Sequence, residues 1–287
     1  MIDLKDFNET GYAVVNNWLS QEECNQFLLD YGQGHTIYNA YDARVASNDI
    51  LEKFESKILD VCKLVNQSTN TDINSIAPPQ WDGAYWDSDY TNFDWHQDHE
   101  STYVFQNLTE YINCYIIIKK EHANFSGLSI LPENKLKQEI SDEQINFIFN
   151  GRGAKHFITN PDNKTTVAFD DCTGNKITLD IDINDLAVTP ATQTGDLLIL
   201  KGTSIHKSQL LKKGHRIALS VRCLNENSLL SASWFTDPKL TSTDAFNYYI
   251  STRKEFYDQW SKALHTKEVQ TIKEVINNLK GLINGRT

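Results

Sequence analysis

The stretch Phe93-Asp-Trp-His-Gln-Asp-His-Glu100 places two potential metal ligands, His96 and Asp98, two residues apart. Successive side chains of a β-strand point to opposite faces, so residues at i and i+2 project from the same side. On a helix, the same spacing would separate the two side chains by about 200° around the axis. The stretch therefore favours a strand that presents an imidazole and a carboxylate to one ion.

A third ligand is available further along the chain. His206 lies in the stretch Gly195-Asp-Leu-Leu-Ile-Leu-Lys-Gly-Thr-Ser-Ile-His-Lys-Ser208, after an apolar run typical of a strand. Two imidazoles and one carboxylate on one face of an ion, with the other positions open, suit non-haem Fe(II) oxygenases. We therefore predict that His96, Asp98 and His206 bind a metal ion and are the catalytic residues.

An acidic co-substrate of such an iron needs a cation, and Arg216 begins the next apolar run. If the runs on either side of Lys213 pair as an antiparallel hairpin, then His206, Ser208 and Arg216 face the same way. A guanidinium meets a carboxylate with two parallel hydrogen bonds, which favours Arg216 as the co-substrate anchor. The alternative is that Arg216 is a strand residue held in a salt bridge.

Taken together, these stretches resemble the phytanoyl-CoA dioxygenase (PhyH-like) family of Fe(II)/2-oxoglutarate-dependent oxygenases, over roughly residues 9 to 225. The resemblance is carried by His96-Gln-Asp98, by Asn124-Phe-Ser-Gly-Leu-Ser-Ile-Leu-Pro-Glu-Asn134, by Gly195-Asp196 leading to His206-Lys-Ser208, and by Arg216. Glu133-Asn134 stands where the family usually has Gly-Ser. This departure leaves the metal site untouched but bears on the shape of the adjoining loop.

The resemblance implies a dioxygenase that uses Fe(II), 2-oxoglutarate as co-substrate and O2. It would hydroxylate an unactivated C–H of a small molecule, such as an amino acid derivative or a natural-product intermediate, and release succinate and CO2. The resemblance also implies that Ser208 donates a hydrogen bond to the co-substrate, and Phe93 and Tyr85 are placed to line that pocket. Related halogenases replace the metal-binding carboxylate with a small residue, so Asp98 favours hydroxylation, although desaturation and ring formation use the same ligands.

Two other classes of protein remain open at this point. The same residues could serve a non-catalytic jelly-roll protein that binds a metal or a small ligand. The stretch also invites comparison with the His-x-His-x-Asp-His motif of zinc hydrolases, but Asp94 stands where that motif has its first histidine. On strand parity, Gln97 faces away from the metal and suits packing, and His99 suits a supporting or structural role.

Composition excludes several kinds of partner. The formal net charge of −11 argues against nucleic acid and anionic membranes as partners. The five cysteines are odd in number and scattered, so we expect buried free thiols and not a disulfide framework or zinc ribbon. No apolar run is long enough to span a bilayer, and residues 1–6 lack the features of a signal peptide, so a cytoplasmic location is expected.

Short strands with turn signals between them predict the fold class: mainly β with flanking helices, around a double-stranded β-helix (jelly roll, cupin-like) core. The predicted strands are 9–18, 81–86, 110–119, 126–131, 165–169, 176–183, 197–201 and 216–224. Capping boxes or apolar periodicity predict helices from Ser20 to about 31, over 50–67 and over 143–150. In the last strand, Arg216, Ser220 and Arg222 share one face, which suits a barrel that holds a ligand.

We expect one oxygenase domain over 1–287, with its core at about 9–225. Residues 135–157 form an insertion that we expect to lie over the mouth of the site, where Arg152, Lys155 and His156 either meet an anionic group or form a solvated basic loop. From Ser242 onwards, a helical extension over about 242–287 carries apolar stripes, which are typical of core or subunit contacts. A homodimer through these helices is therefore a further expectation.

Overall fold

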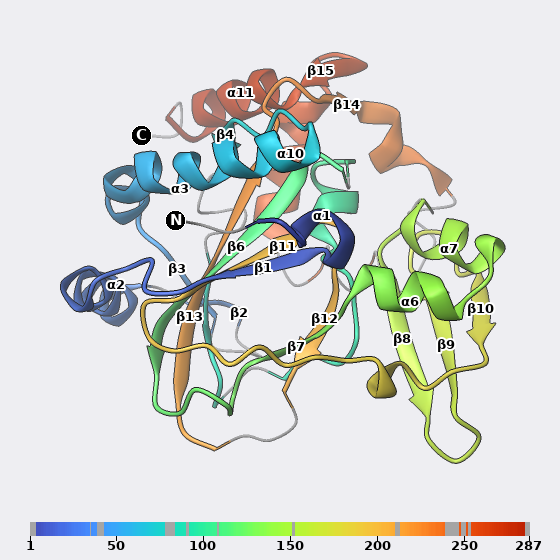
Figure 1. Ribbon diagram of the computed structural model, residues 1–287. Helices are drawn as coiled ribbons and strands as arrows, with labels where there is room; N and C mark the ends of the chain where they lie inside the picture. The colour runs from blue at the N-terminus through green and yellow to red at the C-terminus, as the bar shows by residue number, and fades with distance from the viewer. Residues whose placement is uncertain are drawn as a thin grey trace.

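The structure of the protein is a computed structural model that describes residues 4–34, 36–38, 43–77, 84–89, 92–107, 109–150, 153–209, 213–238, 247, 251 and 254–284. Two antiparallel sheets lie at its centre, and helices flank them (Figure 1). The predicted strand at 81–86 is described only from residue 84, and the predicted tail helices mainly from residue 254, so the earlier parts of both predictions lie outside the described residues.

The large sheet has the strand order β1-β11-β6-β13-β5-β3-β2, and β4 pairs with β13. Its strands are β1 (Tyr12–Val15), β2 (Thr36–Tyr38), β3 (Ala43–Val45), β4 (Ser75–Ile76), β5 (Ala84–Asp87), β6 (Tyr111–Lys120), β11 (Leu197–Lys201) and β13 (Arg216–Leu224). The two longest, β6 and β13, pair over their whole length, with one bulge between Ile217 and Ala218. These two strands form the centre of the sheet.

The small sheet contains β7 (Leu128–Leu131), β8 (Lys155–Asn160), β9 (Thr165–Asp170), β10 (Lys176–Leu179) and β12 (Ile205–Ser208). The strands pair in the orders β10-β9-β8 and β12-β7, and residues 95–97 lie between the two groups. The Phe157 N–H donates to the Trp95 carbonyl at 3.0 Å, and His96 and His206 exchange two backbone hydrogen bonds of 3.0 Å. Residues 95–97 therefore join β8 to β12.

The two sheets face each other across an apolar layer. This layer takes side chains from strands of both sheets, namely Tyr115, Ile117, Leu128, Ile130, Leu198, Leu200 and Ala218. Two antiparallel sheets that pack face to face in this way make a jelly-roll sandwich. The predicted fold class is confirmed.

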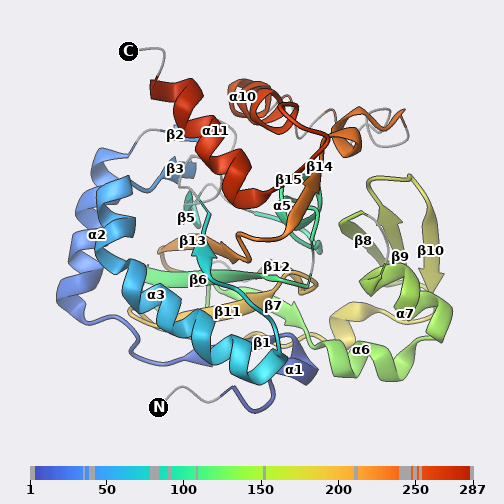
Figure 2. The ribbon, with the colours of Figure 1, turned by 90° about the horizontal axis from the view of Figure 1, so that it is seen from above.

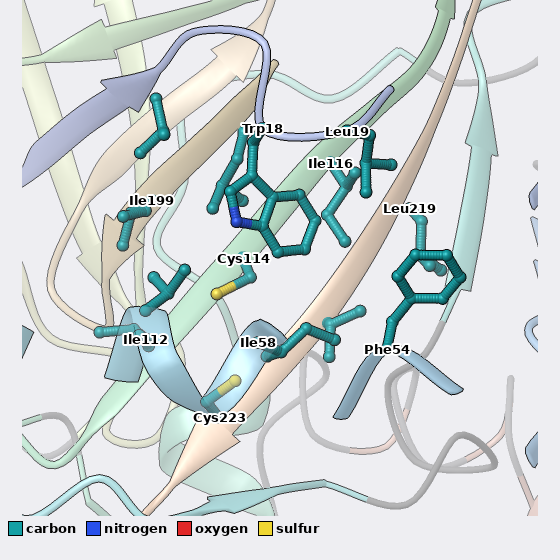
Figure 3. Close-up of a cluster of buried hydrophobic side chains, with 14 of the residues drawn as sticks. Trp18, Leu19, Phe54, Ile58, Ile112, Cys114, Ile116, Ile199, Leu219 and Cys223 are labelled. Carbon is teal, nitrogen blue, oxygen red and sulfur yellow. The ribbon is translucent and has the colours of Figure 1, made fainter. Parts of the chain in front are cut away.

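Helices α2 (Gln21–Gln33) and α3 (Asn48–Thr69) cover the outer face of the large sheet (Figure 2). Phe54 and Ile58 of α3 pack on Ile116 and Leu219 in the cluster of Figure 3. The predicted capping box of α2 is present, since Ser20 and Glu23 exchange side-chain and backbone hydrogen bonds. Both predicted helices are confirmed, as are the buried free thiols of the five cysteines.

The turn before β11 ties that strand to the segment after β1. Gly195 has φ +91°, and a Cβ there would lie 2.6 Å from the Leu19 carbonyl oxygen, so only glycine fits. The Asp196 carboxylate accepts hydrogen bonds from the Asn17 and Gln193 N–H groups, both at 2.8 Å. This pair, one of the motifs that carry the family resemblance, therefore has a structural role.

Helices α6 (Glu133–Glu139) and α7 (Asp142–Phe149) pack on the outer face of the small sheet, against Trp95, Phe157 and Ile205. His96 and His206 belong to the opposite face. The prediction that 135–157 lies over the mouth of the site is therefore wrong for these helices, and β8 is a strand of the sheet itself. Arg152 lies outside the described residues.

Glu133, the departure from the family pattern, begins α6 and is buried. Its carboxylate accepts hydrogen bonds from Thr203 Oγ1 at 2.6 Å and from Lys137 Nζ at 2.9 Å. Glu133 and Asn134 therefore lie in the first turn of a helix.

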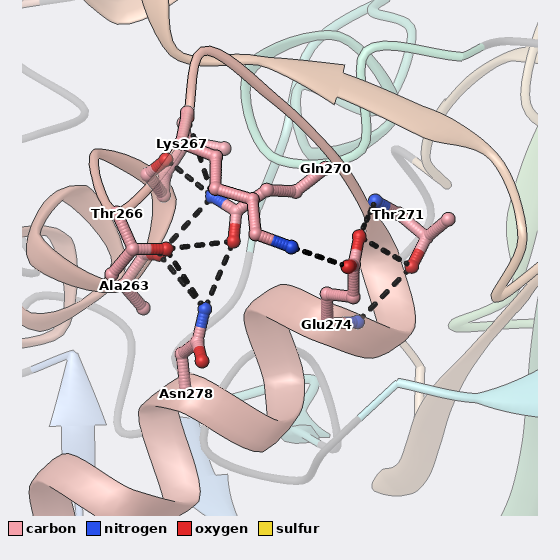
Figure 4. A network of polar contacts seen from close by, with 8 residues as sticks. Ala263, Thr266, Lys267, Gln270, Thr271, Glu274 and Asn278 are labelled. Atoms are coloured by element: carbon pink, nitrogen blue, oxygen red, sulfur yellow. Dashed lines mark hydrogen bonds and ion pairs between the residues drawn. The ribbon is translucent and has the colours of Figure 1, made fainter.

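The C-terminal part contains α10 (Lys254–Leu264), α11 (Ile272–Asn284) and the strand pair β14 (Leu229–Ser231) and β15 (Val269–Thr271). Its apolar stripe packs within the chain, and Trp260 and Val275 are fully buried against Leu230. The buried Gln270 amide binds the Leu264 carbonyl and the Thr266 and Asn278 side chains, which joins the two helices (Figure 4). A homodimer through these helices stays a prediction.

The remaining elements are the one-turn helices α1 (Phe7–Thr10) and α5 (Glu100–Tyr103) and the 3-10 turns η1 (Ile183–Asp185) and η2 (Ala232–Thr236). None of the described helices has the length and apolar character that a bilayer crossing requires.

Candidate metal centre

The backbone brings His96 and His206 together, because each donates its N–H to the carbonyl of the other at 3.0 Å. Directly paired residues of antiparallel segments project from the same face, and Asp98 follows His96 by two positions. The ligand atoms of the three side chains lie within 4.8 Å of one another, and His206 Nε2 is 3.6 Å from Asp98 Oδ1. The structure thus places the three predicted ligands in one cluster on the inner face of the small sheet.

Both imidazoles are held in the tautomer that a metal needs. His96 Nδ1 lies 2.7 Å from the Asp94 carbonyl oxygen, and His206 Nδ1 lies 3.3 Å from the Ser204 carbonyl oxygen. A carbonyl can only accept, so each Nδ1 carries the proton and each Nε2 keeps its lone pair. Burial, with a contribution from His206, lowers the pKa of His96 well below its usual value, which keeps this imidazole neutral.

Only one oxygen of Asp98 faces the two histidines. The other, Oδ2, is 3.1 Å from Asn113 Nδ2, 3.4 Å from the Tyr111 hydroxyl and 3.4 Å from Arg222 Nη2. Burial alone would raise the pKa of Asp98, but the charge of Arg222, together with the hydrogen bond from Asn113, outweighs it and holds the pKa at about 2. The carboxylate is therefore charged and oriented, with Oδ1 turned toward His206.

Sequence reasoning missed these supporting residues. Tyr111 and Asn113 lie two positions apart on β6, so their side chains leave the large sheet on the same side. Arg222 was placed correctly on the polar face of β13, but no pattern pointed to Asp98 as its partner. The contacts cross from one sheet to the other, and strand parity within one segment carries no signal for them.

The predicted hairpin about Lys213 is wrong. Strand β12 pairs with β7 in the small sheet, and β13 pairs with β4, β5 and β6 in the large sheet. Ser208 therefore ends a strand of the small sheet, and Arg216 begins a strand of the large sheet. Arg216 still reaches the small sheet, because its Nη1 donates to the Gly127 carbonyl, directly before β7, at 3.2 Å.

Arg216 is a buried cation without an anionic partner among the described residues. Its side chain is 2% exposed, it forms no ion pair with any described carboxylate, and its Nε has no hydrogen-bond acceptor. The guanidinium lies 5.5 Å from the centre of the Tyr115 ring. A buried charge costs several kcal/mol unless it is paired. This site therefore suits a ligand that brings a carboxylate.

Two further side chains bear on this cation. The Ser208 hydroxyl accepts a hydrogen bond from the Phe93 N–H at 3.0 Å, which leaves its own proton available to a ligand. Burial lowers the pKa of Lys120 to about 8, and the charge of Arg216 contributes. Lys120 was not predicted as a site residue; a lysine at the end of a strand is by itself too common a signal.

The structure separates the two aromatic residues that were predicted to line the pocket. The Phe93 ring lies 5.5 Å from the His96 ring and 5.5 Å from the Trp86 ring, centre to centre, so it borders the site. Tyr85 points the other way, into the layer between the large sheet and α2, where its hydroxyl donates to Asp30 at 2.8 Å. The prediction for Tyr85 is wrong, and Trp86 takes the inward position on β5.

The neighbours of the ligands in sequence also have defined places. Gln97 is buried on the outer face, where Nε2 donates to the Ile148 carbonyl at 3.2 Å and the Thr203 carbonyl at 3.0 Å. Its predicted packing role is confirmed. His99 turns away from the three ligands toward Asp171, with its Nδ1 2.7 Å from Oδ2.

No family model and no curated protein matches the chain. Among solved structures, it is similar to HygX from Streptomyces hygroscopicus, with nickel and 2-oxoglutarate bound: 10% identity, 77% of this chain and 85% of that one, TM-score 0.47. It is also similar to the alpha ketoglutarate dependent carbocyclase SnoK from nogalamycin biosynthesis, with 13% identity over 78% of this chain and 83% of that one and a TM-score of 0.49. A third similar structure is EvdO2 from Micromonospora carbonacea var. aurantiaca, complexed with 2-oxoglutarate, with 15% identity over 78% of this chain and 92% of that one and a TM-score of 0.47.

Proposed function

We propose that the protein is an Fe(II)- and 2-oxoglutarate-dependent dioxygenase of PhyH-like type that hydroxylates a small molecule and releases succinate and CO2. The observation that carries the proposal is the convergence of His96 Nε2, His206 Nε2 and Asp98 Oδ1, with the remaining nitrogen or oxygen of each side chain already bonded elsewhere. Two imidazoles and one carboxylate suit Fe(II) and leave positions for other ligands.

The buried guanidinium supports 2-oxoglutarate as the co-substrate. Arg216 has no carboxylate partner among the described residues, and the Ser208 hydroxyl is free to donate. Both residues lie at the Gly127 end of β7, since the Gly127 carbonyl accepts from Arg216 and from the Gln209 N–H next to Ser208. A dicarboxylate that reaches the metal with one end would place its other carboxylate against this cation.

Bound Fe(II), together with 2-oxoglutarate and O2, would supply the oxidising power to hydroxylate a C–H bond. The residues of the protein hold and orient the metal ligands. Arg222, Asn113 and Tyr111 fix the Asp98 carboxylate, and the Asp94 and Ser204 carbonyls fix the two imidazoles. The Phe93 ring lies beside His96, and the Trp86 ring packs against the Phe93 ring.

The proposal is tested with anaerobic protein. Addition of Fe(II) and then 2-oxoglutarate should produce a visible charge-transfer absorption, and admission of O2 should produce succinate, faster with a substrate than without. The His206→Ala variant should lose both. Absorption without succinate under any substrate of a metabolite panel would favour the non-catalytic binding protein, and turnover that is indifferent to oxygen would favour a zinc hydrolase.

The same panel addresses the substrate. We propose a small molecule, an amino acid derivative or a natural-product intermediate, and test it through substrate-stimulated turnover of 2-oxoglutarate. A compound that raises succinate formation and appears with one added oxygen atom in the product identifies the reaction as hydroxylation. A product that has lost two hydrogens would instead identify desaturation or ring closure.

A further inference from the structure

A second group of two imidazoles and one carboxylate lies beside the first. His99, His156 and Asp171 bring their ligand atoms within 4.8 Å of one another. His99 Nδ1 is 2.7 Å and His156 Nε2 is 3.7 Å from Asp171 Oδ2, and the two imidazole rings lie 4.8 Å apart, centre to centre. None of these three residues takes part in the proposed iron site.

Three separate segments build this group. His99 follows Asp98 directly, His156 on β8 forms a backbone bridge with His96, and Asp171 follows the end of β9. The Asp171 N–H donates to the Ala154 carbonyl at 3.2 Å, which holds the residue beside the start of β8. The pairing of β8 with β9 on one side and with residues 95–97 on the other therefore fixes the spacing of all three side chains.

No described Lys or Arg balances the charge of Asp171. Its side chain is buried, and no described Lys or Arg forms an ion pair with it; its ionic contacts are the two imidazoles. Burial alone would raise the pKa of Asp171, but His99 and His156 outweigh it and hold the pKa at about 2. A buried carboxylate of this kind needs a cation beside it.

The neighbouring carboxylate shows the contrast. Asp170 Oδ2 lies 2.8 Å from the fully buried Lys155 Nζ, and its oxygens also accept hydrogen bonds from the N–H groups of Gly153, Cys172 and Thr173. Asp170 is therefore neutralised and saturated by the chain itself. Asp171 is adjacent in sequence and also buried, but its side-chain contacts are the His99 and His156 imidazoles and the Tyr103 hydroxyl, none of which carries a permanent positive charge.

We propose that His99, His156 and Asp171 form a second binding site for a divalent first-row transition metal of the Zn2+ type. Imidazole nitrogen and carboxylate oxygen are the donors that Zn2+ prefers next to thiolate, and three protein ligands leave one position for water or a ligand oxygen. The His156 side chain is 42% exposed, so an ion and its open position are reached from solvent.

The experiment counts ions in the full-length chain. Protein stripped with a chelator is equilibrated with Zn2+, freed of excess by gel filtration and analysed by mass spectrometry of the metal. We expect two ions per chain in the wild type, one in His206→Ala, one in His156→Ala and none in the double variant. The His156 side chain is half exposed, so its truncation removes little packing, and thermal unfolding verifies that each variant is folded.

The matched control is His215→Ala. His215 belongs to the other described group of a histidine and carboxylates, with Asp87 and Asp89, where Asp87 is already bonded to Tyr31 and to the Asp89 N–H. This variant should keep two ions. An ion count in His156→Ala equal to that of the wild type, or an ion lost in His215→Ala, would each overturn the proposal.

A spectroscopic readout keeps the test independent of the first site. In His206→Ala, Co2+ should give a d–d absorption that is lost when Asp171→Asn is added, and Zn2+ should displace it. No absorption in folded His206→Ala, or absorption that survives Asp171→Asn, would also overturn the second site. Neither result depends on iron or 2-oxoglutarate, so the proposed function can fail while this site stands, and the reverse.

Discussion

Arg222 Nη2 lies 3.4 Å from Asp98 Oδ2, and this contact crosses the jelly roll from the large sheet to the metal-facing side of the small one. Arg222 Nε also donates to the Tyr111 hydroxyl at 3.0 Å, and Tyr111 in turn contacts Oδ2. The carboxylate is therefore fixed by residues of a different sheet from the histidines. Its orientation depends on how the two sheets pack.

Arg222→Lys is expected to weaken metal binding at the triad by about 10- to 100-fold, the usual effect of changes around metal ligands. A lysine keeps the charge but cannot contact Asp98 and Tyr111 with the same planar group. Competition with a coloured chelator measures the affinity. Arg44→Lys is the control, because Arg44 is a partly buried arginine that contacts Tyr31, and this variant should leave the metal affinity unchanged. Equal affinities for both variants would contradict the orienting role.

Arg216→Met is expected to raise the Kd of 2-oxoglutarate while the metal count stays the same. Hydrogen bonds to a charged group contribute about 2–3 kcal/mol, which corresponds to roughly 30- to 150-fold. Ser208→Ala, which removes one neutral hydroxyl, should weaken binding only about 5-fold. Titration of the charge-transfer absorption with 2-oxoglutarate measures the Kd in both variants. A larger loss in Ser208→Ala than in Arg216→Met would show that the cation is not the anchor.

Phe27→Ala is expected to lower the free energy of unfolding by about 3–5 kcal/mol. Phe27 is fully buried between α2 and the sheet, and its ring lies 4.5 Å from the Phe54 ring. Leu29 on the same helix is 68% exposed, so Leu29→Ala should change stability by less than about 0.5 kcal/mol. Denaturant titration compares the free energies of unfolding of the two variants. Similar losses would mean that α2 does not pack as described.

Asp87→Asn is expected to flatten the acid dependence of stability. Burial would raise the pKa of Asp87, but the Asp89 N–H, His215 and the Tyr31 hydroxyl outweigh it and lower the pKa below its usual value. A carboxylate whose pKa is lower in the folded than in the unfolded protein stabilises the folded state at pH values above the unfolded pKa. This stabilisation is lost as the pH falls through the folded pKa. The variant should therefore be about 2 kcal/mol less stable at pH 7, with the gap closing below about pH 4.

Unfolding midpoints from pH 7 down to pH 2 measure this difference. Asp258→Asn is the control, because Asp258 pairs with Lys254 on the exposed face of α10 and such pairs contribute less than about 1 kcal/mol. A gap between wild type and Asp87→Asn that stays constant over the whole pH range would contradict the role of the charge.

Local patterns predicted most of the elements, because they depend on interactions between near neighbours. The strands at 197–201 and 216–224 match β11 and β13, and the capping boxes at Ser20 and Ser141 open α2 and α7. The predicted strand at 110–119 appears as β6 one residue later. Local patterns do not predict elements without such a signal, among them α6, which has no side-chain cap at Pro132, and β8, which lies in the segment predicted to be an insertion.

Within the candidate site, period-two alternation and the choice of donor residues were enough to select His96, Asp98 and His206, and the alternation of β13 was enough to put Arg216 and Arg222 on one face. Pairing between distant strands was not. The pairing of distant strands places β12 and β13 in different sheets, directs Tyr85 toward α2, and brings Arg222 into contact with Asp98. The sequence by itself determined which residues could bind a metal, because side-chain chemistry and strand parity are local properties. Only the tertiary structure decided which residues support them, because contacts between sheets depend on how the whole core packs.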